Sequence, residues 1–318
     1  MGMRTFIDEH YRHFNAGTVQ RTAESLTAFL EGEGKLFLTL AGAMSTAEIG
    51  RSLAEMIRQG HVAAISCTGA NLEEDVFNLV ARSHYRSVPN HEDMTPQDDQ
   101  DLYQAHFNRV TDTCIPEEEA IRRIEGFLLH AWQKATKNNE VHAPHEYLYN
   151  LLNSGDLEVN YDGDPAHSWL LAAAERNLPL FVPGWEDSTL GNIFAARSIE
   201  SLVDASVVES GIATMQRLVS FYRGNTAPLA FFQVGGGIAG DFPICVVPLL
   251  HQDLKQSVPL WSWFAQITDA TASYGGYSGA PPNEKISWGK LATDTPRFNI
   301  QSDATVILPL IFAYILDM

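Results

Sequence analysis

The chain has 318 residues, of which 45% are hydrophobic, so it can bury a large core and is not an intrinsically disordered protein. Its 39 acidic and 21 basic residues give a formal net charge of −18, which argues against binding of nucleic acid or an anionic membrane through a broad basic face. A neutral or polycationic small molecule suits this charge better, and acidity also keeps proteins soluble.

Three widely spaced cysteines, Cys67, Cys114 and Cys245, form neither a C-x-x-C pair nor a disulfide framework. We therefore expect free thiols and a cytoplasmic location. The first residues contain no apolar segment of signal-peptide length. The longest apolar run, 304–316, contains Pro309 and falls short of the roughly 20 residues that cross a bilayer. This run is predicted to be a buried strand or helix.

The first predicted elements form a β–α–β unit. Residues 35–41 have strand character, and 45–48 have the serine-to-glutamate spacing of a capping box, which predicts a helix that starts there. A second buried strand is predicted at 62–67. Strands joined in this way are parallel, so the loops at Gly42 and 68–70 should lie at the carboxyl edge of a sheet, where ligands bind.

An acidic segment follows the second strand. Asn71 can cap a helix with Glu74 at the reciprocal position, and capping alone would explain the acids there. Glu73, Glu74 and Asp75 at the carboxyl edge of a parallel sheet would also form a receptor for an ammonium group. The two roles are compatible, and the local sequence does not choose between them.

Residues 82–162 are more polar and are predicted to be mostly helical, with one helix starting at Pro116, which three glutamates follow. Further strands are predicted at 178–182, 229–234, 263–267 and 306–312. No Gly/Ser linker or internal repeat divides the chain. We therefore predict a single α/β domain over 1–318, with a mostly parallel sheet, helices on both faces and a helical insertion.

Two further loops carry candidate ligand-binding residues. Gly235, Gly237 and Gly240 satisfy G-x-G-x-x-G after an apolar strand, and such glycines let backbone N–H groups approach a pyrophosphate. The residues around Pro243 do not predict the usual helix after this motif, so a tight turn without a ligand is equally compatible. Asp187 follows the strand 178–182 and adds a polar loop at the same edge.

Histidines with i,i+3 spacing lack the acid or cysteine pattern of a metal site, so we predict no metal. These histidines are His10 and His13, and His142 and His145.

The most informative segment lies near the C-terminus. Residues 274–284 are rich in glycine, alanine and proline, and they lead to Ser287-Trp288-Gly289-Lys290. Small residues let a backbone approach a ligand closely, and Trp288 would supply an apolar wall beside a nucleophilic Lys290. Taken alone, a lysine after glycine is usually a surface charge.

Together these segments resemble the deoxyhypusine synthase family, in the same order along most of the chain. The matching segments are 37–44, 68–75, 187–191, 235–237, 278–290 and 303–304. The segment 278–290 reads S-G-A-x-P-x-E-x-x-S-W-G-K, which is highly specific. The resemblance implies a Rossmann-like fold, bound NAD and a homotetramer whose active sites are shared between subunits.

The resemblance also implies a mechanism. NAD takes a hydride from spermidine, Lys290 captures the resulting imine, and an aminobutyl group passes to an acceptor amine. Lys290 is thus the implied catalytic residue. The implied substrate-binding residues are Glu73, Glu74, Glu284, Trp288, Asn192 and Asp241. The implied cofactor-binding residues are Thr68, Gly69, Asp187, Gly235, Gly236, Gly237, Asp303 and Ala304.

The chain departs from the family in the amine pocket. Asn192 stands where the family has the last aspartate of D-G-S-L-G-D, and Asp241 replaces a histidine four residues after the triple glycine. Tyr274 and Tyr277 replace the two aspartates of D-G-S-D-S-G. The residues that recognise the amine have therefore changed, and the identity of the donor is open.

We predict the reaction class and leave the acceptor open between two kinds of amine. One is a protein lysine on the hypusine-bearing translation factor, and the other is a free diamine such as putrescine, which would give homospermidine. The altered pocket favours the small amine. A third reading is a non-catalytic regulator that binds NAD, which would leave Lys290 and Trp288 without an explanation.

Overall fold

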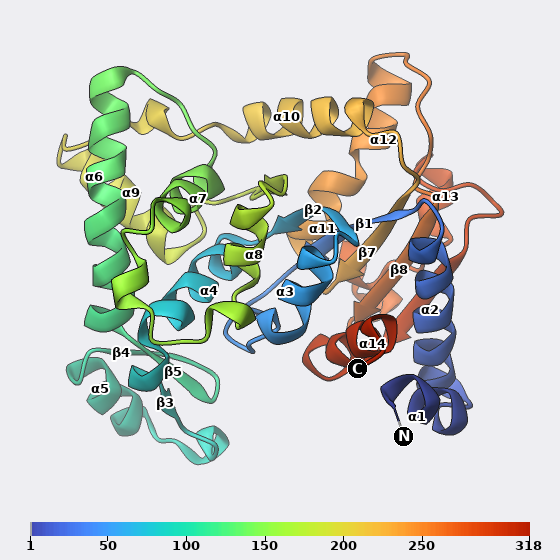
Figure 1. Cartoon of the computed structure of the whole chain (residues 1–318), viewed down its shortest axis with the longest axis horizontal. Helices are drawn as coiled ribbons and strands as arrows, with labels where there is room; N and C mark the ends of the chain where they lie inside the picture. Colours follow the sequence, from blue (N-terminus) through green and yellow to red (C-terminus); the bar gives the residue numbers. More distant parts are fainter. Residues whose placement is uncertain (1) are drawn as a thin grey trace.

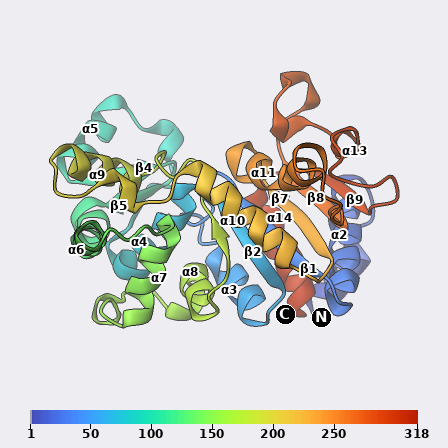
Figure 2. The same ribbon diagram turned by 90° about the horizontal axis from the view of Figure 1, so that it is seen from above.

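The computed structural model describes residues 2–318 and has a parallel six-stranded sheet at its centre, with strand order β6-β2-β1-β7-β8-β9. Its strands are Lys35–Leu40 (β1), Val62–Cys67 (β2), Leu180–Phe181 (β6), Leu229–Val234 (β7), Trp263–Thr268 (β8) and Arg297–Gln301 (β9). Helices cover both faces (Figures 1 and 2), which confirms the predicted α/β fold class.

The α-helices are distributed along the whole chain between these strands (Figure 1). They are Met3–His10 (α1), Phe14–Glu31 (α2), Gly50–Arg58 (α3), Gly69–Ala81 (α4), Pro96–Gln104 (α5), Arg123–Asn138 (α6), Pro144–Ser154 (α7), Trp169–Glu175 (α8), Thr189–Ile199 (α9), Gly211–Gly224 (α10), Gly237–Ile244 (α11), Val246–Pro248 (α12), Glu284–Ser287 (α13) and Ala304–Leu316 (α14).

The two faces of the sheet lie in different hydrophobic cores because successive residues of a strand point to opposite sides. Leu36, Leu38 and Leu40 of β1 belong to the larger core, which also contains buried residues of α2, α3 and α14. Phe37 of the same strand belongs to the second core, with buried residues of α10, α11 and α12. Figure 2 shows α10 running across this second face.

A row of stacked rings lies on the second face. Phe181, Phe37, Phe231 and Phe264 follow one another with ring centroids 6.0, 5.7 and 6.1 Å apart. The strand between β6 and β1 has small residues here, with Ala64 in register with Phe37 and Ser66 in register with Phe181, so the two rings can meet. This row forms the apolar part of the face.

Two residues nearer the carboxyl edge, the same face becomes polar. Five neighbouring strands place polar residues in register there: Ser66, Thr39, Gln233, Gln266 and Asn299. The side-chain nitrogen of Gln266 donates to Asn299 Oδ1 over 2.8 Å and to the carbonyl of Ala280 over 3.2 Å. The second bond attaches residues 274–284, called the glycine-rich loop below, to the sheet.

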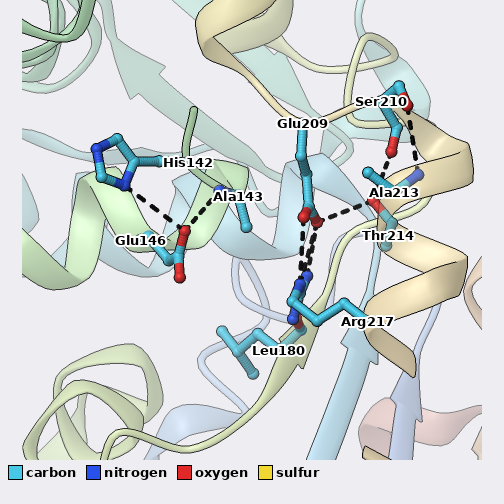
Figure 3. A network of polar contacts seen from close by, with 9 residues as sticks. All are labelled: His142, Ala143, Glu146, Leu180, Glu209, Ser210, Ala213, Thr214 and Arg217. Carbon is cyan, nitrogen blue, oxygen red and sulfur yellow. Dashed lines mark hydrogen bonds and ion pairs between the residues drawn. The ribbon is translucent and has the colours of Figure 1, made fainter. Parts of the chain in front are cut away.

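The edge strand β6 is attached to α10 by Arg217 (Figure 3). Its Nη1 donates to the carbonyl of Leu180 over 2.7 Å, and its guanidinium lies 4.7 Å from the ring centroid of Phe181. Nη2 pairs with Glu209 Oε1 over 2.8 Å, and the same oxygen accepts a hydrogen bond from the Thr214 hydroxyl. These contacts fix α10 against the edge of the sheet.

Residues 82–162 contain an antiparallel three-stranded sheet that the sequence did not predict, with order β3-β5-β4. Its strands are Arg86–Ser87 (β3), Phe107–Val110 (β4) and Thr113–Pro116 (β5). Strands of two to four residues are too short to show an alternating pattern. The helix expected after Pro116 is present, with a π-helical turn at Glu117–Arg122 that leads into α6.

The predicted capping box at 45–48 is wrong, since α3 begins at Gly50. The Ser45 hydroxyl donates instead to the carbonyl of Asn71 over 2.7 Å, and Glu48 has a φ of +56°, outside the helical range. Asn71 is not a cap either. Thr68 caps α4, while the Asn71 side chain donates to the carbonyl of Gly42 over 2.8 Å.

The strand predicted at 306–312 is also wrong, because this segment belongs to α14 and the last strand is β9. Asp303 Oδ1 accepts a hydrogen bond from the backbone N–H of Thr305 and thereby caps the helix. The glycine motif does lead into a helix, contrary to the prediction, with Pro243 near the end of α11.

The three cysteines are free, as predicted, with Cys67 and Cys114 buried. Within residues 2–318, no helix combines the length and the apolar character needed to cross a bilayer.

Candidate active site

The loops that carry the predicted site residues follow the strands of the parallel sheet at its carboxyl edge. The chain passes from β1 to β2 on one side of β1, whereas β7, β8 and β9 lie on the other side. The strand order therefore reverses between β1 and β7, and ligands of open α/β sheets bind at such a point. The loops next to it begin at Ala41 and Gly235.

The glycine turn after β7 has no space for side chains on one side. Gly235 and Gly237 have φ values of +75° and +61°. A Cβ on Gly236 would overlap the Ser278 side chain, and one on Gly235 would lie 2.9 Å from the Cβ of Ala41. The space beside Gly237 is open, and α11 begins there, so an anionic group can approach the turn and the helix N-terminus.

Thr68, Gly69 and Asp187 lie around two adjacent helix N-termini. The Thr68 hydroxyl donates to the carbonyl of Gly42 over 2.8 Å and caps α4. Ser188 caps α9, and a Cβ on Gly69 would lie 2.6 Å from the Ser188 Cβ. Asp187 immediately precedes this cap and is exposed. The predicted cofactor-binding residues that follow β2 and the one that follows β6 are therefore close together.

Glu73 and Glu74 are buried, and groups of the protein itself bind their carboxylates. Glu73 is 3% exposed, and its two oxygens accept hydrogen bonds from the backbone N–H groups of Thr189 and Leu190 over 2.9 and 2.7 Å. Burial raises its pKa to about 7 against the opposing effect of these bonds. Glu74 accepts a hydrogen bond from the Thr46 hydroxyl, and burial raises its pKa too. The pair thus stabilises the first turn of α9 and the loop after β1.

A cavity of about 330 Å³ lies between α11 and the glycine-rich loop. Among its lining residues are Asp241, Tyr277, Glu284, Lys285, Trp288 and Lys290. The structure thus brings together four of the predicted site residues, Asp241, Glu284, Trp288 and Lys290. Asp241 and Glu284 are exposed, so both carboxylates can meet a ligand from solvent.

Lys290 lies inside this cavity and is only 5% exposed. Its Nζ is 3.7 Å from Asp241 Oδ1 and 5.7 Å from the ring centroid of Tyr277. Trp288 lies 5.6 Å from the same nitrogen but is 63% exposed, so it stands at the mouth rather than forming an enclosing wall. Gly289, with a φ of +68°, makes the turn that sends the lysine inward.

A second lysine in the cavity was missed by the sequence analysis. Lys285 is 2% exposed, and its Nζ lies 4.6 Å from the ring centroid of Tyr277 and 5.9 Å from that of Phe264. The nitrogen donates to the carbonyl of Ala280 over 3.3 Å. Burial, and then the charge of Lys290, lower its pKa to about 8. The residue follows Glu284 at a position where the recognised motif allows any amino acid, so the motif did not indicate a role for it.

The ring of Tyr277 lies beside the amines of both lysines. Gly240 leaves space for its ring, since a Cβ there would lie 3.1 Å from Tyr277 Cε1. The Tyr277 hydroxyl is buried and has no hydrogen-bond partner within residues 2–318. Burial raises its pKa well above the ordinary value, so the ring is a neutral, largely apolar wall.

The remaining predicted residues do not line the lysine cavity. Asn192 lies in α9, where its side chain donates to the carbonyl of Ser188 over 2.9 Å. Asp303 and Ala304 lie at the start of α14, beyond β9. Within residues 2–318, no group of three or more histidine, cysteine, aspartate or glutamate side chains is arranged to hold a metal.

Comparison with known proteins gives one consistent family. The family model described as "Deoxyhypusine synthase" matches residues 8–315. A "Deoxyhypusine synthase-like protein" from Thermosynechococcus vestitus is 28% identical, covering 100% of this chain and 79% of its own length. A "Probable deoxyhypusine synthase 1" from Archaeoglobus fulgidus is 27% identical, covering 96% of this chain and 90% of its own length.

Solved structures agree on the fold. A crystal structure described as a "putative deoxyhypusine synthase" from Entamoeba histolytica has a TM-score of 0.57 at 12% identity. It covers 99% of this chain and 92% of its own. At this identity the likeness concerns the fold alone.

Proposed function

Because the chain belongs to the deoxyhypusine synthase family, we propose that it is an NAD-dependent aminobutyltransferase that acts through an imine on Lys290. The observation that carries this proposal is a buried lysine amine that lines a cavity within 3.7 Å of a carboxylate, Asp241. An amine in this position can attack a carbon that enters the cavity, and the carboxylate can take up or return its proton.

The loops at the carboxyl edge are suited to hold NAD. The glycine turn at 235–237 and the N-terminus of α11 would bind its pyrophosphate, because the space beside Gly237 is open where a helix begins. By resemblance to the family, Thr68, Gly69, Asp187, Asp303 and Ala304 would bind the rest of the cofactor. When bound, NAD removes a hydride from the carbon beside a donor amine and returns it later.

The cavity residues then divide the remaining work. Unprotonated Lys290 forms a bond to the oxidised carbon, and the leaving amine departs with the electron pair of its own bond. Asp241 and Glu284 would hold ammonium groups of the substrate, while Trp288 would cover the mouth. Glu73 and Glu74 would act indirectly, by stabilising the loops on which the cofactor rests.

The donor that we propose is spermidine, and the acceptor is a free diamine, of which putrescine, which would give homospermidine, is one example. The exchange of the family's carboxylates for Asn192, Tyr274 and Tyr277 supports a rebuilt amine site. The alternatives are a protein lysine on the hypusine-bearing translation factor and a regulator that binds NAD without catalysis. From the family we further propose a single NAD-binding domain over 1–318 that works as a cytoplasmic homotetramer.

The imine is tested by borohydride trapping with NAD and spermidine, followed by peptide mass analysis. We expect an adduct on Lys290 that is absent in Lys290→Ala and unchanged in Lys255→Ala, which alters an exposed lysine. Absence of any adduct, or an undiminished adduct in Lys290→Ala, would end the imine mechanism and favour the regulator.

The acceptor needs a separate experiment. Enzyme, NAD and spermidine are incubated with putrescine, agmatine or the purified translation factor, and the products are identified by mass. We expect an aminobutyl group on the free diamine. Transfer to the translation factor alone would instead establish the protein-lysine acceptor.

A further inference from the structure

The lysine cavity contains a cation that the proposed reaction does not use. Lys285 lines the cavity beside Lys290 and is almost fully buried. Within residues 2–318, no carboxylate lies close enough to form an ion pair with it, and its one hydrogen bond goes to the carbonyl of Ala280. An ammonium held in this way has lost most of its water without gaining a counter-ion, which is unfavourable unless a ligand supplies one.

Two aromatic rings and a backbone carbonyl hold the Lys285 amine in place. The rings of Tyr277 and Phe264 lie 4.6 and 5.9 Å from its nitrogen. The carbonyl that it contacts is held by Gln266 of the polar row on the sheet. The ammonium is therefore kept at the inner wall of the cavity. Its pKa of about 8 leaves it mostly protonated at neutral pH.

The charges in the cavity indicate which bound molecule carries the negative group that pairs with Lys285. Asp241 and Glu284 are the carboxylates of the lining, and Lys285 and Lys290 are its amines. Once Lys290 is consumed in a neutral imine, the ammonium of the bound aminobutyl group and the ammonium of Lys285 balance the two carboxylates. A plain diamine, with one amine neutral for attack and the other protonated, would then add an unbalanced positive charge.

Building on the proposed function, we propose that Lys285 binds a carboxylate of the acceptor, so that the acceptor is a diamine that also carries a carboxylate. Such a molecule is neutral overall when its attacking amine is unprotonated. One compact ammonium suits one carboxylate, whereas a phosphate normally needs several donors. Lys285 is therefore a specificity residue of the acceptor step.

In the transfer step the acceptor amine forms a bond to the imine carbon and gives up two protons to Lys290 Nζ. The bond from that carbon to Lys290 Nζ breaks with its electron pair staying on the nitrogen, and Lys290 leaves as the free amine. The new carbon–nitrogen double bond then takes up the hydride that was removed from the donor on its carbon and one proton on its nitrogen. Lys285 takes no part in these bonds and holds the acceptor through its carboxylate.

The test compares two acceptors that differ by one carboxylate, putrescine and ornithine, in reactions with NAD and spermidine. We expect kcat/KM to favour ornithine by about tenfold or more, the usual strength of one charge-assisted hydrogen bond. Lys285→Met removes the charge, keeps most of the length of the side chain and should reverse the preference. Lys285→Arg should retain it, and Lys255→Met on the surface should leave it unchanged.

A preference for putrescine in the wild type, or a ratio that Lys285→Met does not alter, would overturn this inference. If Lys290 still forms its adduct with spermidine, the proposed function survives that result. If no adduct forms, binding of putrescine and ornithine, measured by calorimetry, tests whether Lys285 binds a carboxylate, independently of catalysis. Tighter binding of ornithine that Lys285→Met abolishes would support the carboxylate site, and equal binding would overturn it.

Discussion

Glu73 and Lys290 are both almost fully buried, at 3% and 5% exposed, yet they are held in opposite ways. Each oxygen of Glu73 accepts a hydrogen bond from a backbone N–H of α9, so the fold uses the hydrogen-bonding capacity of this carboxyl group. The Lys290 amine has one carboxylate at 3.7 Å, lies near the Cys245 thiol and two rings, and lines a cavity.

Burial alone therefore does not mark a reactive group. A buried charge whose hydrogen-bonding capacity is filled by backbone partners stabilises structure, whereas one with few partners beside a cavity is available to a ligand. Substitutions in the Glu73 region should therefore change stability, and substitutions in the Lys290 region should change chemistry.

The largest effect is expected for Lys290→Ala. Removal of a nucleophile should lower the rate of aminobutyl transfer by about 1000-fold or more. The melting temperature should change little, because the lysine contributes few bonds to the fold. Product mass and thermal unfolding measure the two quantities. A large loss of stability would place Lys290 in the same class as Glu73 and break the comparison.

Gly236→Ala alters the turn between the two regions. The added methyl group would overlap the Ser278 side chain, so the turn and α11 must shift. Because a displacement of about 1 Å can reduce activity by 100-fold, we expect a comparable loss, together with weaker NAD binding measured by calorimetry. Gly211→Ala is the matched control, since no atom lies within 4 Å of its added methyl. Unchanged NAD binding in Gly236→Ala would contradict the role of the turn.

Glu73→Ala tests the structural side of the comparison. Two backbone N–H groups lose their acceptor, so the free energy of unfolding should fall by about 2–4 kcal/mol. Denaturant titration measures the change, and Glu9→Ala on an exposed position serves as the control. The Lys290 adduct should still form in the folded fraction. Normal stability with a lost adduct would mean that Glu73 serves chemistry directly.

The pH dependence of stability should come from the same region. The pKa of Glu73 rises from 4.5 to about 7 on folding, so between these values the folded state holds more protons than the unfolded state. The free energy of unfolding should therefore decrease as pH rises through this window, by about 3 kcal/mol for this group. Unfolding series at several pH values should show the slope in the wild type and a smaller slope in Glu73→Ala.

The smallest effect is expected for the exposed Trp288. Trp288→Ala should change the free energy of unfolding by no more than about 0.5 kcal/mol, as is usual for surface positions. Loss of its ring near the Lys290 amine should raise the KM for the donor with a smaller effect on kcat. Steady-state kinetics measure the change in KM, and thermal unfolding measures the change in stability. Substitution of a core tryptophan such as Trp169, which is fully buried, should instead lower stability strongly.

Much of the sheet was predictable because its strands are apolar runs bounded by glycine or polar residues. The predicted strands 62–67 and 229–234 match β2 and β7 to the residue. The segment 306–312 was misassigned because α14 is apolar around its whole circumference and shows no helical period. The capping box failed because Ser45 has a tertiary partner, Asn71, that no local pattern reveals.

The candidate site was predictable where a motif supplied it and not elsewhere. Lys290, Trp288 and Glu284 come from one specific motif and line one cavity. Lys285 gave no signal because its significance depends on the rings of Tyr277 and Phe264, which the fold alone brings around it. The partners of Glu73 lie 116 and 117 residues away, so its structural role was equally hidden.

Arg217 has a consequence for how copies of this chain behave in concentrated solution. An edge strand with free carbonyls can pair with a strand of another molecule and start aggregation. Here β6 is two residues long, and a charged side chain already binds the carbonyl of Leu180. The guanidinium thus protects this end of the sheet from intermolecular pairing. An Arg217→Leu variant should therefore aggregate while its molecules are still folded.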